Sequence, residues 1–104
     1  MRRGEVWWAD MPKPAGRRPV VLLSRNRSIE VREYVIVAEV TRTVRDIPTE
    51  VRLGREDGLP AACVVNLDVI NTVPKRTLAS LITVLNPAKQ TEIKQALHFA
   101  LDLS

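Results

Sequence analysis

The sequence predicts a mainly β (α+β) domain, in which a small, strongly bent barrel carries one helix at its C-terminal end. Short β-branched and apolar runs recur over residues 5–85, and proline- and glycine-marked turns separate them. One helical pattern follows these runs. Many short strands with one terminal helix favour this architecture. Because 104 residues suffice for one hydrophobic core and not for two, we expect a single domain over residues 1–104.

Three strands are expected in the N-terminal half. Residues 5–10 combine apolar and aromatic side chains, and the loop 11–16 is marked by proline and glycine. Residues 19–23 form a continuous apolar run, which is typical of a strand covered on both faces. The polar segment 25–32 has room for one helical turn, and the β-branched residues 34–41 predict the next strand.

The C-terminal half predicts the remaining strands and the helix. Residues 49–53 alternate polar and apolar side chains, so this strand should be half exposed. After a turn at 57–60, strands are expected over 63–67, 68–73 and 80–85, of which the first two can form one long bent strand. The helix should begin at Asn86-Pro87, since Asn caps helices well and Pro suits the first helical position.

The helix should present one apolar face to the barrel. Its helically spaced apolar residues are Ile93, Leu97, Ala100 and Leu101, and the arc is widened by Ala96, Phe99 and Leu103. A chain this short buries a limited fraction of its surface. Dimerisation would cover apolar surface that remains, which is a hypothesis at this point.

Composition narrows the functional classes. No run of about 18 apolar residues is present, so no membrane span is expected. The basic N-terminus has no apolar signal core behind it, and a single cysteine, Cys63, cannot close an intrachain disulfide. We therefore expect a cytoplasmic protein. Residues 1–55 carry 12 Lys and Arg against 7 Asp and Glu, nearly all of the cations being arginine. This excess suits either phosphate binding or a solubilising surface.

No metal or cofactor site is expected. Cys63 and His98 are the sole residues of their types and show no paired spacing, whereas zinc sites use several such ligands. The four glycines are scattered, so no phosphate-binding glycine loop forms, and no Gly-x-Ser-x-Gly motif is present. Cys63 lies in an apolar stretch without a base partner, which is typical of an inert buried thiol.

The candidate catalytic residues lie at strand ends. Arg18 stands at the start of the second expected strand and Thr41 at the end of the third. If these strands are neighbours, a guanidinium and a hydroxyl meet at one end of the barrel. Such a pair suits RNA cleavage by the adjacent 2′-OH, because arginine stabilises the charge that develops on the phosphate. The alternative is that Arg18 only forms an ion pair with Asp10 or Glu39.

A resemblance to a known family favours the catalytic interpretation. The segments that carry it are Arg3-Gly4-Glu5-Val6-Trp7-Trp8-Ala9-Asp10, Arg18-Pro19-Val20-Val21-Leu22-Leu23-Ser24, Val40-Thr41 with Arg42-Thr43-Val44-Arg45, Ile47-Pro48-Thr49-Glu50-Val51, the stretch 64–73, and the final helix. In this order they resemble the MazF/PemK/Kid family of toxin endoribonucleases over almost the whole chain. No single segment is specific to this family. The occurrence of all of them in this order within 104 residues is specific.

The resemblance implies an SH3-like β-barrel with a C-terminal helix, paired as a homodimer. It implies a toxin of a type II toxin–antitoxin system, a metal-independent endoribonuclease that cleaves single-stranded RNA without a cofactor. Arg18 and Thr41 match the family's catalytic positions. Backbone contacts are then expected from Arg17, Arg42 and Arg45, and base contacts from Asn66, Asp68 and Asn71. A MazE-like antitoxin with an acidic disordered segment is expected to compete for the same groove.

The chain also departs from the family pattern. The loop before Arg18 is short and lacks the usual Gly-Ser-Glu, so a carboxylate found there in relatives is missing. Glu39 should share a strand face with Thr41, and we expect it to orient Arg18 or to act as the base. Val69 and Asn71 stand where relatives often carry Gln and a basic residue, which predicts an uncommon base preference. A CcdB-like gyrase poison and a non-cleaving RNA-binding barrel are the alternative functions.

Overall fold

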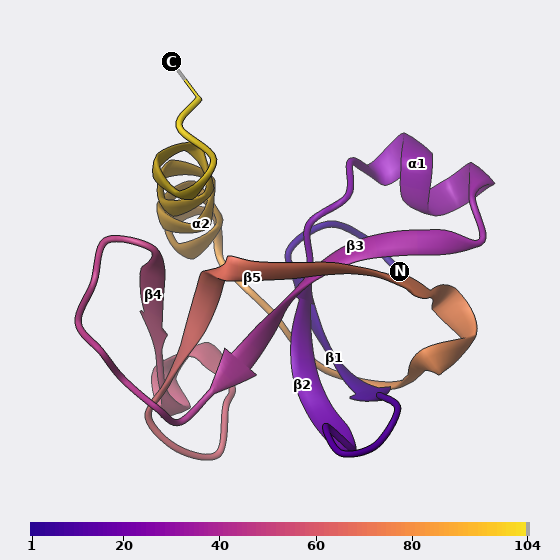
Figure 1. Cartoon of the computed structure of the whole chain (residues 1–104), viewed down its shortest axis with the longest axis horizontal. Helices are drawn as coiled ribbons and strands as arrows, with labels where there is room; N and C mark the ends of the chain where they lie inside the picture. Colours follow the sequence, from indigo (N-terminus) through magenta and orange to yellow (C-terminus); the bar gives the residue numbers. More distant parts are fainter. Residues whose placement is uncertain (104) are drawn as a thin grey trace.

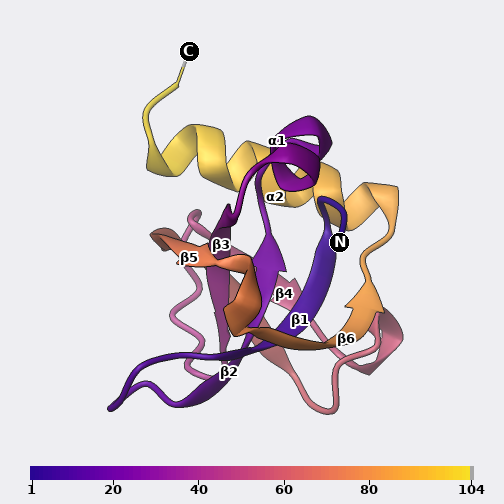
Figure 2. The ribbon, with the colours of Figure 1, turned by 90° about the vertical axis from the view of Figure 1, so that its right-hand side faces the viewer.

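The computed structural model, which describes residues 1–103, contains one antiparallel sheet of six strands in the order β4-β5-β3-β2-β1-β6. The strands are β1 (Glu5–Asp10), β2 (Arg17–Leu22), β3 (Tyr34–Thr41), β4 (Glu50–Leu53), β5 (Cys63–Pro74) and β6 (Leu78–Val84). The helices are α1 (Asn26–Val31) and α2 (Pro87–Ala100), with short 3-10 turns at Arg55–Asp57 and Lys75–Thr77. The sheet curls into a half-barrel, and α2 lies across one end of it (Figure 1, Figure 2). The predicted mainly β class with a terminal helix is confirmed.

The curled sheet buries apolar side chains on both of its faces. One cluster lies between the sheet and α2 and includes Val21, Ala38, Val65 and Ile93. The second lies on the opposite face, under α1, and consists of Ala9, Val20, Leu22, Ile29, Val35, Val37, Val73 and Leu78. Strand β2 contributes to both clusters, because its side chains alternate between the faces. The prediction that this strand is covered on both sides is therefore confirmed.

The long strand β5 explains how the sheet bends. Residues 63–74 form one continuous strand, as the sequence allowed for 63–67 and 68–73. Its pairing with β3 shifts in the middle, since Ala38 opposes Ile70 whereas Val40 opposes Val65. The extra residues on β5 form an irregularity that strengthens the local bend of a sheet. Beyond this point the last residues of β3 and the short β4 turn away from the rest of the sheet (Figure 1).

Helix α2 begins where the sequence predicts, and only part of its apolar arc is buried. The side-chain oxygen of Asn86 accepts a hydrogen bond from the Lys89 backbone N–H at 2.8 Å. Ile93 and Ala96 are buried and contact the sheet, with Leu97 and Ala100 partly buried beside them. The expectation of one apolar face directed to the barrel is wrong for Phe99, Leu101 and Leu103, which are exposed.

The end of the half-barrel away from α2 is built from loops. The β1–β2 loop and the β4–β5 loop both reach this end (Figure 1, Figure 2). Strand β2 pairs with β3 through Val20 opposite Glu39, Val21 opposite Ala38 and Leu22 opposite Val37, and the pairing stops there. The first residues of β2, from Arg17 to Pro19, pair with β1 alone. The two central strands therefore part at this end and leave space between them.

Candidate active site

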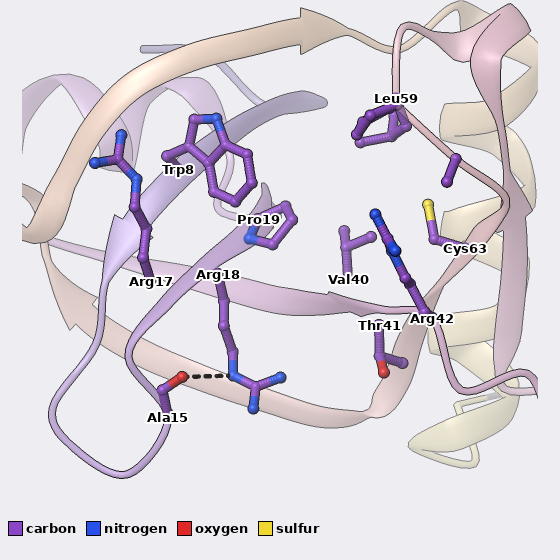
Figure 3. A pocket seen from close by; sticks show the side chains of 12 residues that line it. Trp8, Ala15, Arg17, Arg18, Pro19, Val40, Thr41, Arg42, Leu59 and Cys63 are labelled. Atoms are coloured by element: carbon purple, nitrogen blue, oxygen red, sulfur yellow. Dashed lines mark hydrogen bonds between the residues drawn. The ribbon is translucent and has the colours of Figure 1, made fainter.

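A pocket of about 310 Å³ occupies the space where β2 and β3 part (Figure 3). Its walls come from one residue of β1, the β1–β2 loop, the start of β2, the end of β3, the β4–β5 loop and the first residue of β5. The lining residues are Trp8, Ala15, Arg17, Arg18, Pro19, Val40, Thr41, Arg42, Leu59, Pro60, Ala61 and Cys63. Arg18 and Thr41, the two residues that the sequence singles out for catalysis, therefore line the same cavity.

The guanidinium of Arg18 is held from behind by two acceptors. Its Nε donates a hydrogen bond of 3.0 Å to the carbonyl oxygen of Ala15 in the β1–β2 loop. The same Nε lies 3.6 Å from Oε1 of Glu39 on β3. The terminal nitrogens of Arg18 extend into the space between β2 and Thr41 (Figure 3). Both Nη groups thus remain available to a negatively charged group in the pocket.

Glu39 reaches Arg18 because of the strand register. It is paired with Val20, and Arg18 lies two residues earlier on β2, so their side chains share one face of the sheet. On its other side, Oε2 of Glu39 accepts a long hydrogen bond of 3.4 Å from Nδ2 of Asn71. Glu39 itself does not line the pocket. Of the two roles expected for it, these contacts favour the orientation of Arg18.

Thr41 presents its hydroxyl at the opposite rim of the pocket (Figure 3). Its Oγ1 accepts a hydrogen bond of 3.2 Å from the Thr43 backbone N–H. A hydroxyl has one proton to donate, and this bond does not use it. Thr41 can therefore donate to a phosphate oxygen or contact a ribose hydroxyl.

Two further arginines flank the pocket. The guanidinium carbon of Arg17 lies 5.5 Å from the centre of the Trp8 ring, which is a cation–π contact. Arg42 extends toward Val40 and Cys63 (Figure 3). Burial raises the pKa of the Cys63 thiol, while the charge of Arg42 opposes that shift. Cys63 is thus a neutral thiol in the pocket wall at neutral pH, in keeping with its expected inert character.

The other predicted RNA-contacting residues lie away from this pocket. Arg45 is exposed in the loop between β3 and β4, where its backbone N–H donates to Glu50 at 2.9 Å. On β5, the carbonyl oxygen of the Asn66 side chain accepts from the Asp68 N–H at 2.9 Å. Oδ2 of Asp68 accepts from the Thr49 hydroxyl at 2.7 Å. These polar groups support the loop preceding β4, and Asn71 contacts Glu39.

Sequence reasoning missed the apolar part of the pocket. Trp8 and Pro19 looked like strand residues, and the turn at 57–60 gave no reason to place Leu59 and Pro60 beside Arg18. The signal that was present is the run Leu59-Pro60-Ala61-Ala62-Cys63, which is unusually apolar for a loop. Loops carry binding residues when a rigid scaffold positions them.

Within residues 1–103, no three His, Cys, Asp or Glu side chains are grouped so that they could hold a metal ion. Over the same part of the chain, no helix has the length and apolar character needed to cross a membrane.

Solved structures place this fold among bacterial toxins. An endoribonuclease from mycobacterial species, solved with its cognate antitoxin, superimposes with a TM-score of 0.91 at 33% identity, covering 100% of this chain and 97% of that one. The Mycobacterium tuberculosis toxin MazF-mt6 gives a TM-score of 0.89 at 30% identity, covering 96% and 98% of the two chains. Fold and pocket thus define a small half-barrel toxin domain.

Sequence comparison identifies the family. The sequence model of one protein family, described as the PemK-like, MazF-like toxin of type II toxin–antitoxin systems, matches residues 2–101. A probable endoribonuclease MazF2 of M. tuberculosis is 41% identical over 99 residues, which are 94% of this chain and 95% of that protein. A probable endoribonuclease MazF5 of the same species is 39% identical over 103 residues, which are 98% and 94% of the two chains. The chain belongs to the PemK-like, MazF-like toxin family, which confirms the resemblance seen in the sequence.

Proposed function

We propose that this protein is the toxin of a type II toxin–antitoxin system and cleaves single-stranded RNA without a metal ion. The observation that carries the proposal is the shared pocket of Arg18 and Thr41, in a chain whose relatives are named endoribonucleases. Unpaired RNA fits this site, because bases can be read along their edges only where they are splayed out of a helix. Cleavage of transcripts would stop translation and growth.

In the proposed reaction the ribose 2′-OH of the RNA attacks the adjacent phosphate, and two side chains of the pocket assist. The 2′-oxygen of the ribose forms a bond to the adjacent phosphorus, and the bond from phosphorus to the 5′-oxygen breaks. The proton of the 2′-OH leaves to a base, and the departing 5′-oxygen receives a proton. The products are a 2′,3′-cyclic phosphate and a 5′-hydroxyl end, so no water, oxidant or metal is consumed.

Arg18 and Thr41 serve this reaction in different ways. The Nη groups of Arg18 bind the phosphate oxygens, which gain charge as the phosphorus becomes five-coordinate, and Arg18 also acts as the acid toward the leaving oxygen. Thr41 positions the 2′-OH or a phosphate oxygen through its hydroxyl. Glu39 acts as a positioning residue, because its carboxylate lies against Nε of Arg18 and outside the pocket.

The remaining predicted RNA contacts come from arginines at or near the pocket and from polar side chains on β5. Arg17 and Arg42 line the pocket and bind the RNA backbone there, and Arg45 extends the basic path along the loop after β3. Asn66, Asp68 and Asn71 are base-contact candidates, although each already uses one polar atom within the chain. We therefore expect these three to contribute less to binding than the arginines.

Residues 1–104 work as a single domain, as a homodimer, in the cytoplasm. Exposed apolar side chains on and after α2, notably Phe99, Leu101 and Leu103, support pairing of two copies, since pairing can cover exposed apolar surface. A cognate MazE-like antitoxin with an acidic segment is the protein partner. The solved complex of a similar mycobacterial endoribonuclease with its antitoxin supports this assignment.

Brief expression followed by end-mapping of total RNA tests the function. The wild type should produce cuts at one short RNA word with 5′-hydroxyl ends, in mRNA, tRNA or rRNA, and Arg18→Ala should produce very few. Purified protein should cleave in the presence of a chelator. Growth arrest that persists with Arg18→Ala would instead indicate the CcdB-like gyrase poison, and RNA binding without cuts would indicate a passive RNA-binding barrel.

A further inference from the structure

The pocket beside Arg18 has two unlike halves (Figure 3). One half carries Arg18 and the Thr41 hydroxyl, and Arg17 and Arg42 border both halves, Arg17 against Trp8 and Arg42 toward Val40 and Cys63. The other half, which we call the apolar slot, is lined by Trp8, Pro19, Val40, Leu59, Pro60, Ala61 and Cys63. Cleavage of a phosphodiester uses only the charged half, so the apolar slot requires another explanation.

The walls of the apolar slot are held in place by the fold. Leu59 and Cys63 belong to the core cluster under α2, with 3% and 6% of their surfaces exposed. The backbone N–H of Leu59 donates to the Gly54 carbonyl at 3.2 Å. The preceding residue, Gly58, has a φ of 94°, a conformation that favours glycine, and the Thr83 hydroxyl donates to the carbonyl of Asp57 at 2.9 Å. The slot is therefore preformed.

The opposite wall is equally constrained. Trp8 lies in the paired part of β1, opposite Pro19 on β2 and Ser80 on β6. The guanidinium of Arg17 stacks on its ring at 5.5 Å. Proline and tryptophan side chains lose little conformational freedom when a ligand binds, because both are rigid. A flat ligand can thus enter between Trp8 and Pro19 on one side and Leu59 and Cys63 on the other.

The position of the slot indicates the chemistry of its occupant. Guanidinium groups stand around it, so the ligand must combine an apolar, flat part with a nearby negative charge. A nucleotide has this form, since its base presents π faces and its phosphates lie one ribose away. The pocket volume of about 310 Å³ falls at the lower end of the range typical of small-ligand sites, roughly 300–1,000 Å³.

We propose that the apolar slot binds the nucleobase of one of the two nucleotides joined by the cleaved linkage. This inference rests on the proposed RNA cleavage. It assigns the β4–β5 loop, and Leu59-Pro60-Ala61 in particular, to base selection at the cut. Binding of the base also fixes its ribose and phosphate against Arg18 and Thr41, which orients the reacting atoms.

Abasic substrates test the proposal. The cut site of the wild type is mapped first, and short RNAs are then made with one abasic nucleotide either directly before the cut, directly after it, or several nucleotides away and outside the mapped word. The slot predicts a loss of about 10- to 100-fold in kcat/KM at one of the two flanking positions, a size typical of a lost base-stacking contact. The distant abasic nucleotide should have little effect.

A slot-filling variant gives the second measurement. Ala61→Phe should fill the slot and leave Arg18 and Thr41 in place, with Ala62→Phe as the matched control, because Ala62 is exposed and does not line the pocket. Ala61→Phe should lower kcat/KM about 10- to 100-fold on intact RNA and leave cleavage of the sensitive abasic RNA near the wild-type value. Ala62→Phe should behave like wild type on both. Thermal unfolding of each variant checks the fold.

Each outcome has one interpretation. If the wild type cleaves no RNA, the proposed function fails and the slot assignment with it. If the wild type cleaves but neither flanking abasic nucleotide reduces the rate more than the distant one, the slot assignment alone fails. If Ala61→Phe keeps the abasic discrimination and weakens only antitoxin binding, the slot serves a protein side chain and our proposal is overturned.

Discussion

Nε of Arg18 lies 3.6 Å from Oε1 of Glu39, although 20 residues separate them in the sequence. The register of β2 on β3 produces this contact, since Val20 opposes Glu39 and Arg18 lies on the same face as Val20. The Arg18 side chain is 41% exposed, and ion pairs this open contribute at most about 1 kcal/mol to stability. The main effect of this ion pair is therefore to orient the Arg18 side chain, and its contribution to stability is small.

Replacement of Arg18 should remove most of the cleavage and leave the fold intact. Arg18→Ala should lower kcat by about 10²- to 10³-fold, the usual cost of losing a group that stabilises transition-state charge. Arg18→Lys should recover only part of this loss, because an ammonium cannot donate to Ala15 and to the phosphate as a planar fork does. Single-turnover cleavage gives the rates. Full activity in Arg18→Ala would remove Arg18 from the mechanism.

Glu39→Gln separates two roles for the carboxylate. A positioning role predicts a decrease in kcat of about 3- to 10-fold with little change in KM, because the loss is that of one partly exposed ion pair. The acidic limb of the pH–rate profile should then persist. If Glu39 were the general base, that limb would disappear along with most of the activity. Near-normal cleavage would exclude both roles.

Thr41 should act through its hydroxyl. Thr41→Ser keeps the oxygen and should retain most of the activity, whereas the nearly isosteric Thr41→Val should lose about 10- to 100-fold, as expected when a hydrogen bond to a charged group is removed. Thr41 is only partly buried, so both variants should fold. Equal activities of the serine and valine variants would show that only the shape of Thr41 matters.

The capping residue of α2 provides a test of stability that does not involve the pocket. Asn86→Ala removes the side-chain acceptor for the Lys89 N–H and should cost about 1 kcal/mol. In a domain of this size that corresponds to a decrease in Tm of about 4–8 °C, measured by circular dichroism. Asn86→Asp retains an acceptor and should lie close to wild type. Cleavage per folded molecule should be unchanged in both.

Inhibition by the cognate antitoxin tests whether partner and RNA share one surface. A molar excess of antitoxin should abolish cleavage, and added RNA should slow complex formation more strongly at low salt, because both ligands are negatively charged. Fluorescence of labelled RNA during antitoxin titration follows the competition. Cleavage that continues within a stable toxin–antitoxin complex would contradict a shared groove.

Much of the fold could be predicted because local patterns decide it. The β-branched run 34–41 and the apolar run after Arg18 form strands that match their predicted bounds closely, and Asn86-Pro87 begins the last helix. The open form of the curled sheet could not be read locally, because it depends on the pairing shift between Ala38 and Val40. The exposure of Phe99 depends on tertiary packing, and helical spacing alone does not reveal it.

The part of the candidate site that lies at strand ends could be predicted from the sequence, and the part formed by a loop could not. Arg18 and Thr41 became candidates because each stands at the end of a clear strand, and the family resemblance then favoured their catalytic role. Glu39 was added because it lies two residues before Thr41. The apolar wall was missed, since the pocket brings together Trp8 and the β4–β5 loop, which lie about 50 residues apart in the sequence. Asn66 and Asp68 look like free polar groups in the sequence, yet backbone and hydroxyl donors already occupy one oxygen of each.

Because β2 pairs with β3 only from Val20 to Leu22 and the two strands part on the Arg17 side of Val20, few of the residues around the cavity are tied to one another by backbone ladders. Substitutions in the β1–β2 loop or at Pro60 and Ala61, which lie outside the buried core, can therefore accumulate without disturbing the sheet below. A lineage of such proteins could change the transcripts it attacks while its folding stability stays nearly constant. Diversity of RNA targets would then arise from the segments around the separated ends of β2 and β3, and the rest of the sheet would be inherited unchanged.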